Sequence, residues 1–389
     1  MSDPRVSGIG HTAFGQEPER TARDLFAEAG LAALEDADVE PSDVEALYYG
    51  NFMGEMADHQ GHQGPMMAEA IGADTVGTTR YESACASAGA AVRQAVRDVR
   101  NGEAEVVVVG GAERMTNIGT AGATEALAIA ADDLYEVNMG MTFPGAYALM
   151  ARAYMERYGG STEDLGHIAV KNHENALENQ YAQLRTEITL EDHADAPALA
   201  SPLGLYDSCP ITDGAAAIVL TSPEYAAEHG LDDSIAITGT GQGGDRLALH
   251  DREDITRTPA AERAGAEAYA DAGIGPNDVD FAEVHDCFTI AEVLAIEALD
   301  FFEVGEGLSA AREGITTRDG EFPVNVTGGL KAKGHPVGAT GVSQIAHVTM
   351  LLRGDHGRAD AVAGSDTAIA HNAGGTVGST TVHVLEVAD

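Results

Sequence analysis

The chain has 389 residues, of which 44% are hydrophobic, and its 63 Asp and Glu against 22 Lys and Arg give a formal net charge of −41. That length and apolar content support a large core and argue against disorder, whereas the charge excludes binding to nucleic acid or to anionic membranes. The acidic residues are spread along the whole chain, which predicts the surface of a halophilic protein whose self-repulsion is screened in a high-salt cytoplasm. An ordinary acidic enzyme is the alternative.

The three cysteines, Cys85, Cys209 and Cys287, form neither an even-numbered disulfide set nor a C-x-x-C pair. This usage fits a reducing compartment and argues against structural zinc. The N-terminus lacks an apolar signal segment, and no apolar run approaches the roughly 18 residues that span a bilayer. We therefore expect a soluble, cytoplasmic protein.

Short β-type runs alternate with helical patterns in the first half of the chain, which is typical of βαβ units on a mostly parallel sheet. In chain order we expect a strand at 6–9, a helix at 21–35, a strand at 47–49, a helix after Cys85 and a strand at 106–109. A long insertion at 115–205 contains a helix around 149–154, and a strand returns at 215–220.

The second half of the chain repeats the first. Residues 29–44 and 264–279, offset by 235 positions, share eight identities in sixteen, and both read as a helix, a Pro-x-Asp-Val turn and a strand. Each half then has a Gly-rich loop and a helix, and it ends in two strands, expected in the second half at 360–363 and 380–386. The repeat predicts one pseudo-symmetric αβ unit; chance similarity between Ala-rich and Asp-rich helices is the alternative.

Cys85 stands at the start of its expected helix, in the small-residue run Ser-Ala-Cys-Ala-Ser-Ala-Gly. The free N–H groups and the positive dipole end of a helix stabilise a thiolate, and small neighbours let a substrate approach the sulfur. Taken alone, this position favours an inert core thiol, because free cysteine is among the most buried residue types.

Two histidines stand in loops of the second half that correspond to strand-to-helix loops of the first half. An expected strand at 281–284 runs into His285, and His335 lies in the Gly-rich run 328–341. Loops at the carboxyl ends of parallel strands are where α/β proteins place their chemistry, so Cys85 and both histidines are expected to meet at one end of the molecule. A thiolate, a base and oxyanion donors are what acyl transfer requires.

At these residues the chain resembles the thiolases over nearly its full length. The run Gly-Gly-x-x-x-x-Gly-His-Pro-x-Gly-Ala-x-Gly is highly specific for that superfamily. The details are most similar to the branch of sterol-carrier-protein-X-type and archaeal acetyl-CoA acetyltransferases (β-ketothiolases), and with the acidic surface they imply a haloarchaeal member. The segments that carry the resemblance are the Cys85 loop, 139–142, 209–215, 285–288, 328–341 and 371–375.

Two departures separate the chain from the ordinary thiolases. Their Asn-Glu-Ala-Phe motif is His-Asp-Cys-Phe here, at 285–288, and their late Cys-x-Gly motif is His-Asn-Ala-Gly-Gly, at 371–375, without a cysteine. In the sterol-carrier-type branch the cysteine of His-Asp-Cys-Phe is placed to act as the second acid/base. The resemblance therefore implies that role for Cys287, with a plain core cysteine as the alternative.

The resemblance also implies roles for the other candidates. Cys85 would carry the acyl group, His335 would activate it, and both His285 and His335 would polarise thioester carbonyls. The backbone N–H groups of Cys85 and of the loop at Gly375 would form a second oxyanion site. His371 is a weaker auxiliary candidate, because its loop faces the same end of the molecule.

The implied fold is the duplicated five-layered αβαβα thiolase fold with an inserted loop domain. The N-terminal half would span 1–230, including the loop domain at 115–205, and the C-terminal half would span 231–389. The implied reaction is a reversible Claisen condensation of two acyl-CoA molecules, for example of two acetyl-CoA to acetoacetyl-CoA and CoA, without a metal or an organic cofactor. The alternatives are a decarboxylating ketoacyl synthase of the same superfamily and a non-catalytic scaffold that binds acyl-CoA or a partner.

The resemblance implies partners as well. We expect acyl-CoA and CoA as ligands and a homodimer or tetramer in solution. Archaeal members of the family can work with a small OB-fold, zinc-containing subunit, which is therefore a candidate partner, whereas nucleic acid and membranes are excluded by the charge.

Overall fold

The computed structural model describes residues 2–388, and within them nine strands form one mixed sheet in the order β3-β2-β4-β7-β1-β8-β11-β10-β9. A short ribbon of β5 and β6 stands apart from it. The strands are β1 (Arg5–His11), β2 (Ala46–Gly50), β3 (Gly77–Tyr81), β4 (Val106–Glu113), β5 (Ala198–Ala200), β6 (Leu203–Gly204), β7 (Gly214–Thr221), β8 (Ile235–Gly244), β9 (Phe281–Glu283), β10 (Thr367–Gly374) and β11 (Ser379–Val387).

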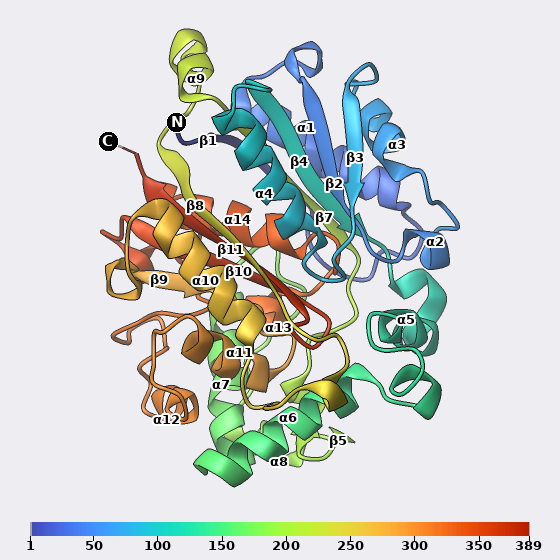
Figure 1. Cartoon of the computed structure of the whole chain (residues 1–389), viewed down its shortest axis with the longest axis vertical. Coiled ribbons are helices and arrows are strands. Elements are labelled where there is room, and N and C mark those ends of the chain that lie inside the picture. Colours follow the sequence, from blue (N-terminus) through green and yellow to red (C-terminus); the bar gives the residue numbers. More distant parts are fainter. Residues whose placement is uncertain (1, 389) are drawn as a thin grey trace.

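The α-helices surround this sheet and run between its two parts (Figure 1). They are α1 (Ala22–Ala37), α2 (Gly54–Ala57), α3 (Gln63–Ala70), α4 (Ser87–Arg100), α5 (Gly119–Ala128), α6 (Phe143–Tyr158), α7 (Thr162–Ala176), α8 (Leu190–Asp195), α9 (Pro223–His229), α10 (Pro259–Ala272), α11 (Thr289–Ala298), α12 (Gly307–Arg312), α13 (Gly329–Lys333) and α14 (Thr340–Arg353).

The sheet consists of two parts with the same strand order, joined at the residue pair Arg5–Ala236 between β1 and β8. In the first part β2 pairs with β4 in parallel, and both β4 and β1 pair with β7 antiparallel. In the second part β9 pairs with β10 in parallel, and both β10 and β8 pair with β11 antiparallel. In the second part, the position that corresponds to β3 is occupied only by a parallel bridge between Ala282 and Val324.

Helices α4 and α14 form the central layer, because each contacts the other and strands of both parts, whereas α1 and α10 cover the outer faces. The two central helices meet at glycines. A Cβ on Gly341 would lie 2.4 Å from the backbone nitrogen of Gly89, and one on Gly89 would lie 2.1 Å from Oγ1 of Thr381. Since Cys85 precedes α4 and His335 precedes α14, this close packing brings the two candidate residues to the same end of the layer.

Most of the expected elements are confirmed, and local sequence signals set their ends. At the start of α1, for example, the N–H of Asp24 donates to Oγ1 of Thr21 at 3.1 Å and the N–H of Thr21 donates back at 2.9 Å, a reciprocal capping box. The strand expected at 360–363 is wrong. That segment is a 3₁₀ helix, Ala359–Val362, and the strand is β10, which contains His371.

The expected loop at His371 is therefore a strand, buried along its whole length between β9 and β11. Its polar side chains obscure the strand pattern, because His371 and Asn372 find hydrogen-bond partners inside the protein instead of water. The polar stretch expected inside the insertion is also ordered: it forms α7, which buries Lys171 and Asn172.

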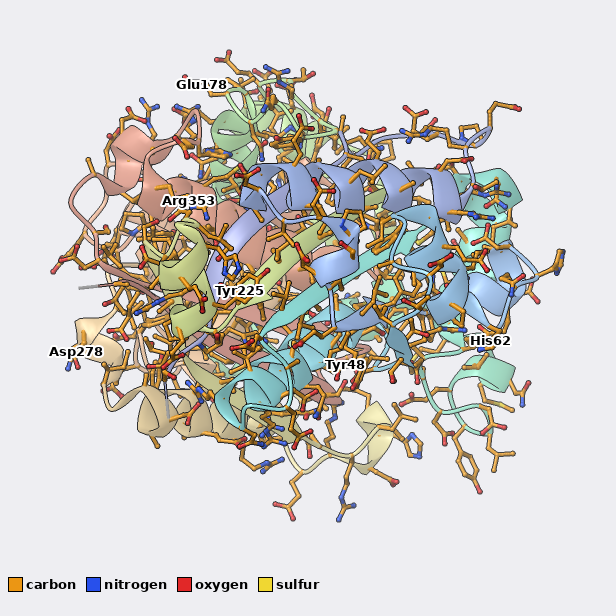
Figure 2. All side chains as sticks on the ribbon, turned by 90° about the horizontal axis from the view of Figure 1, so that it is seen from above. Tyr48, His62, Glu178, Tyr225, Asp278 and Arg353 are labelled. Carbon is orange, nitrogen blue, oxygen red and sulfur yellow. The ribbon has the colours of Figure 1, made fainter. Side chains whose placement is uncertain are left out.

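Charged side chains project from the molecule on every side in the view of Figure 2. Arg353, labelled there, pairs with Asp36 at 3.2 Å and with Asp232 at 3.0 Å. The three lysines of the sequence are different, because Lys171, Lys331 and Lys333 are only 6%, 1% and 1% exposed. Among residues 2–388 no helix combines the length and the apolar character that crossing a bilayer demands.

Candidate active site

A cavity of about 510 Å³ opens where α4 and α14 begin. Cys85, Cys287, His335 and Gly375 line it. Much of the remaining wall is apolar and comes from the insertion between β4 and β7, so that this insertion covers the pocket. Its apolar wall includes Met115, Leu127, Phe143, Leu199, Leu205 and Ile211.

Cys85 sits in a tight turn directly before α4. The turn is closed by hydrogen bonds from the N–H of Ala86 to the carbonyl oxygen of Ser83, at 3.0 Å, and from the hydroxyl of Ser87 to that of Ala84, at 2.6 Å. Ala84 adopts a positive φ of 49°, which a non-glycine residue rarely does. The strained turn holds the sulfur at the cavity wall.

The sulfur of Cys85 and one ring nitrogen each of His285 and His335 lie within 4.8 Å of one another. The two imidazole rings meet edge to face, with centroids 4.9 Å apart and planes at 86°. The expected meeting of these three residues is thus present in the structure, and it combines one residue from the first half of the chain with two from the second.

The hydrogen bonds of His335 fix which of its nitrogens faces the cysteine. The hydroxyl of Thr340 donates to the carbonyl oxygen of Pro336 at 3.0 Å, so it accepts from Nδ1–H of His335 at 2.7 Å. Nε2 is therefore unprotonated and free to accept a proton. The backbone N–H of His335 also donates to Oγ1 of Thr212, at 3.0 Å, which ties the loop to the start of β7.

His285 has the opposite tautomer. The side-chain amide of Asn372 donates to its Nδ1 at 3.2 Å, so Nε2 carries the proton. That Nε2–H is buried and has no partner among the described residues, which leaves it as a donor for an incoming oxygen. The backbone N–H of His285 donates to Nδ1 of His371, also at 3.2 Å. His371 thus lies behind His285, and neither of these two residues lines the cavity.

Burial keeps the pair of Cys85 and His335 neutral in the resting protein. It raises the pKa of Cys85 to about 12, although the N–H of Gly375 faces the thiol and opposes the rise. Burial, assisted by the charge of Lys333, lowers the pKa of His335 to about 3. The expected stabilisation of a thiolate by the helix start is outweighed by desolvation, because the ordinary electrostatic benefit of a helix end is only ~1 kcal/mol.

Cys287 faces the same cavity from the end of β9 and is 6% exposed. Burial raises its pKa well above the ordinary value, and its thiol makes a hydrogen bond with the hydroxyl of Tyr147. That hydroxyl also donates to the carbonyl oxygen of Gly375 at 3.0 Å, and the Tyr147 ring stacks on Phe288 at 4.7 Å. Tyr147 therefore connects Cys287 to the loop that faces Cys85, a link that sequence reasoning missed.

Sequence reasoning also missed Glu113, a fully buried carboxylate at the end of β4. It accepts the backbone N–H groups of Phe52 at 2.9 Å, of Met53 at 3.0 Å and of Gly338 at 3.0 Å. Burial raises its pKa to about 7. Glu113 thereby fixes the loop after His335 to the first half of the chain. Its position at the carboxyl end of an all-buried strand was the signal that could have identified it.

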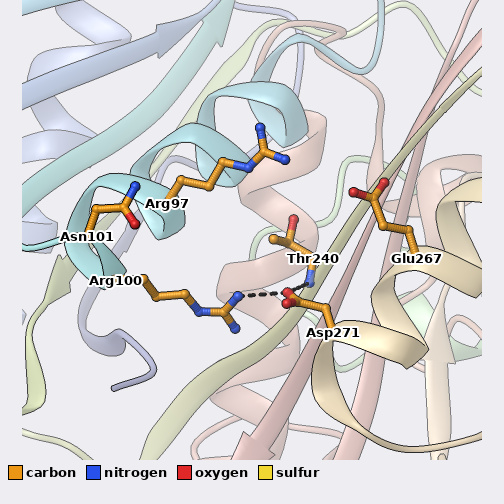
Figure 3. Close-up of a pocket in the computed structure, with 6 residues that line it drawn as sticks. All are labelled: Arg97, Arg100, Asn101, Thr240, Glu267 and Asp271. Carbon is orange, nitrogen blue, oxygen red and sulfur yellow. Dashed lines mark hydrogen bonds and ion pairs between the residues drawn. The ribbon is translucent and has the colours of Figure 1, made fainter. Parts of the chain in front are cut away.

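A smaller hollow of about 190 Å³ lies at the other end of α4, between that helix and α10 (Figure 3). Arg100 pairs there with Asp271 at 2.7 Å, and the same carboxylate accepts the backbone N–H of Thr240 at 2.9 Å. No cysteine or histidine lines it. This site joins the two halves of the molecule and offers no nucleophile.

The chain matches two family descriptions, "Thiolase, N-terminal domain" over residues 6–224 and "Thiolase C-terminal domain-like" over residues 241–387. It is 42% identical to an acetyl-CoA acetyltransferase of Methanothermobacter thermautotrophicus, over 99% of this chain and 100% of that protein. It is 30% identical to human sterol carrier protein 2, over 95% of this chain and 69% of that protein.

A solved structure described as an "Ltp2-ChsH2(DUF35) aldolase" has a TM-score of 0.83 and 28% sequence identity, and the match covers 99% of this chain and 98% of that one. These comparisons cover both halves of the chain. They agree with the duplicated sheet and with the close set of one cysteine and two histidines. The chain belongs to the thiolases.

Proposed function

We propose that this protein is an acyl-CoA C-acyltransferase, a thiolase in the enzymatic sense, which interconverts two acyl-CoA molecules with a β-ketoacyl-CoA and CoA. Its simplest reaction is the formation of acetoacetyl-CoA from two acetyl-CoA. The observation that carries the proposal is the Cys85 sulfur within 4.8 Å of two imidazoles, at a cavity that a second cysteine also lines. The acetyl-CoA acetyltransferase relative at 42% identity supports it.

The first half of the reaction would load the acyl group onto Cys85. The thiol gives its proton to the free Nε2 of His335 as the sulfur attacks the thioester carbonyl, and the CoA sulfur leaves with that proton. The unpartnered Nε2–H of His285 and the N–H groups of Cys85 and Gly375 provide donors for oxyanions. Each such donor contributes typically ~10²–10³ in rate.

The second half would join or split the carbon–carbon bond. In the cleavage direction Cys85 gives its proton to Nε2 of His335 and attacks the β-keto carbonyl, the C–C bond breaks, and the acetyl-CoA enolate takes a proton from the Cys287 thiol. Burial keeps that thiol protonated in the resting protein, which suits this step. The resulting thiolate then removes the proton of CoA as CoA attacks the acyl-cysteine, and the Cys85 sulfur leaves with the proton that His335 holds. Condensation runs through the same steps in reverse.

We propose that this chemistry needs neither metal nor organic cofactor. One thiolate and two imidazoles are also a set of ligands that binds zinc. A metal ion on the Cys85 sulfur would, however, occupy the lone pair that must attack the thioester. Activity should therefore survive dialysis against a chelator, and a loss of activity that added zinc restores would contradict the proposal.

The deciding experiment compares thiolytic cleavage of acetoacetyl-CoA with decarboxylation of malonyl-CoA, while free CoA thiol is monitored. The thiolase proposal expects cleavage, and it expects mass spectrometry after incubation with acetyl-CoA to place the acetyl group on the peptide that contains Cys85. Cys85→Ala should abolish both signals, and His335→Ala should slow them strongly. Turnover of malonyl-CoA alone would favour a decarboxylating synthase, and no turnover of either would favour a binding scaffold.

We further propose that the protein forms a homodimer or tetramer in the cytoplasm and associates with a small OB-fold, zinc-containing subunit. The description of the structural neighbour, which includes a DUF35 component, supports a partner. Large apolar side chains also stay exposed beside the cavity cover, among them Leu134, Tyr135 and Met139 at 59%, 68% and 74%. Light scattering of the purified chain, alone and coexpressed with its genomic neighbours, would test both. We also propose that the chain is divided into two thiolase halves. The N-terminal half spans 1–230 and contains a loop domain at 115–205, and the C-terminal half spans 231–389.

A further inference from the structure

Lys331 is a buried cation in the wall of the candidate acyl pocket. It lies on the short helix α13, is 1% exposed, and lines the cavity beside Tyr206 and Cys209. Its Nζ donates to Nε2 of His173 at 3.2 Å, because Nδ1 of that histidine donates to the carbonyl oxygen of Thr186 at 2.8 Å. This bond uses one of the three hydrogens of the ammonium group.

The ammonium of Lys331 has no counter-ion in contact. Within residues 2–388 no carboxylate oxygen lies within the 4.0 Å of an ion pair with it, whereas Lys171 meets a carboxylate of Glu292 at 2.5 Å. The two carboxylates whose charges raise the pKa of Lys331, Asp207 and Asp286, make their hydrogen bonds to other groups. Asp207 accepts from His193 and Thr289, and Asp286 accepts from Asn172 and the N–H of Leu330.

A buried charge without a partner is costly, so its position calls for a ligand. Burial lowers the pKa of Lys331 to about 8, while Cys209, Asp286 and Asp207 oppose the fall. The side chain therefore still carries its charge at neutral pH. The Tyr206 ring, 5.8 Å from Nζ, adds a weak cation–π contact, which neither removes the charge nor fills the remaining donors.

We propose that Lys331 is an anion subsite of the acyl pocket, which binds a carboxylate at the far end of the acyl chain. The protein would then accept acyl-CoA substrates of the dicarboxylic class in addition to acetyl groups. This inference rests on the proposed thiolase function. A phosphate of CoA is the other anion in the reaction, but the whole pantetheine arm separates it from the thioester. Lys331 instead adjoins Cys209, whose N–H bonds to the carbonyl oxygen of Cys287 at 3.0 Å.

The test compares thiolytic cleavage of 3-oxoadipyl-CoA with that of 3-oxohexanoyl-CoA, which have the same chain length and differ in a terminal carboxylate against a methyl group. The wild-type protein should have the higher kcat/KM on 3-oxoadipyl-CoA. Lys331→Met should lower that value by roughly 10- to 100-fold and leave cleavage of 3-oxohexanoyl-CoA within about twofold, since a hydrogen-bonded charge pair is worth that much. Lys331→Arg is the matched control, because it keeps a cation at this position of the cavity wall and should keep the preference for 3-oxoadipyl-CoA.

The outcomes separate the two proposals. Cleavage of 3-oxohexanoyl-CoA without any wild-type preference for 3-oxoadipyl-CoA overturns the subsite and leaves the thiolase function standing; this comparison needs no variant to fold. No cleavage of either substrate by a protein that cleaves acetoacetyl-CoA also overturns the subsite alone, whereas no cleavage of all three substrates overturns both proposals. N-acetylcysteamine thioesters of the two acids test the phosphate source. If Lys331→Met lowers kcat/KM for both CoA thioesters and for neither N-acetylcysteamine thioester, Lys331 binds a phosphate of CoA and the proposed acyl subsite is wrong.

Discussion

At the scale of single residues, Cys85 experiences two opposed effects. The start of α4 and the N–H of Gly375 favour its thiolate, yet burial dominates and raises the pKa of the thiol to about 12. The neutral pair with His335 means that the nucleophile forms only when a substrate is in place to receive it. Such a thiol resists oxidation and alkylation better than a cysteine with a lowered pKa.

We predict that iodoacetamide alkylation of Cys85 is slow at neutral pH and accelerates about tenfold per pH unit from about pH 6 to pH 9, because the thiolate fraction grows in that proportion below the pKa. Peptide mass spectrometry would follow the adduct on Cys85 separately from the other cysteines. A rate that levels off near neutral pH would instead indicate a preformed thiolate–imidazolium pair.

Cys287 is predicted to act in the carbon–carbon step and not in acylation. Cys287→Ser should keep acetylation of Cys85 by acetyl-CoA but lose cleavage and condensation of acetoacetyl-CoA by ~10²–10⁴, the usual range for a placed proton donor. A burst of acetyl-enzyme without turnover would show the split. Condensation at the parental rate would reduce Cys287 to a packing residue and leave the proton to His285 or to an added subunit.

At the scale of elements, the contact between α4 and α14 determines how closely the nucleophile and the base approach. Neither helix carries a side chain at the crossing, since Gly89 and Gly341 face each other there. The loops of Cys85 and His335 are extensions of these helices, and Glu113 fastens the second loop to the first half through Gly338. Any separation of the two helices would therefore increase the distance between Cys85 and His335.

Gly341→Ala is predicted to destabilise the protein by about 1–3 kcal/mol, the usual cost of overpacking, and to lower kcat more than it raises KM. The added Cβ would lie 2.4 Å from the backbone of Gly89, which has no flexible side chain to move aside. Gly15→Ala is the control, because its Cβ would meet nothing within 4 Å. Urea denaturation and steady-state kinetics of both variants would check this; equal behaviour of the two would refute the role of the crossing.

Sequence patterns predicted the elements whose apolar spacing is regular, such as β1, α1 and α4, and the motif around His335. They failed at β10, where His371 and Asn372 are buried by long-range hydrogen bonds that no local pattern encodes. The set of Cys85, His285 and His335 could be anticipated because a duplicated fold puts corresponding loops together. Tyr147 and Lys331 could not, because their roles arise only from contacts between distant segments, and Glu113 offered only its position at the carboxyl end of β4 as a signal.

At the scale of the whole molecule, most of the acidic side chains behind the net charge of −41 lie on the surface. Many arginines pair with acidic neighbours, as Arg100 and Arg353 do, the latter labelled in Figure 2. The remaining acidic groups repel one another. Their repulsion is screened only when the Debye length is short, about 3 Å at 1 M salt against about 30 Å at 0.01 M. The halophilic character predicted from the composition rests on this balance.

We predict that the melting temperature rises strongly with salt between about 0.01 M and 1 M NaCl, and that dialysis into dilute buffer unfolds or dissociates the protein. Differential scanning fluorimetry across this range, with light scattering for the oligomer, would measure it. A melting temperature independent of salt would refute the halophilic interpretation and leave an ordinary acidic enzyme.

The burial of all three lysines also affects how the protein reacts with acylating reagents, including its own substrate. Acetyl-CoA slowly acetylates accessible amines, but no lysine side chain stands on this surface to be modified. We predict that an N-hydroxysuccinimide ester leaves Lys171, Lys331 and Lys333 unlabelled in the native protein and labels all three after denaturation. Amine-directed crosslinkers should accordingly fail to trap its oligomers, so that carboxylate-directed reagents are the suitable choice for that purpose.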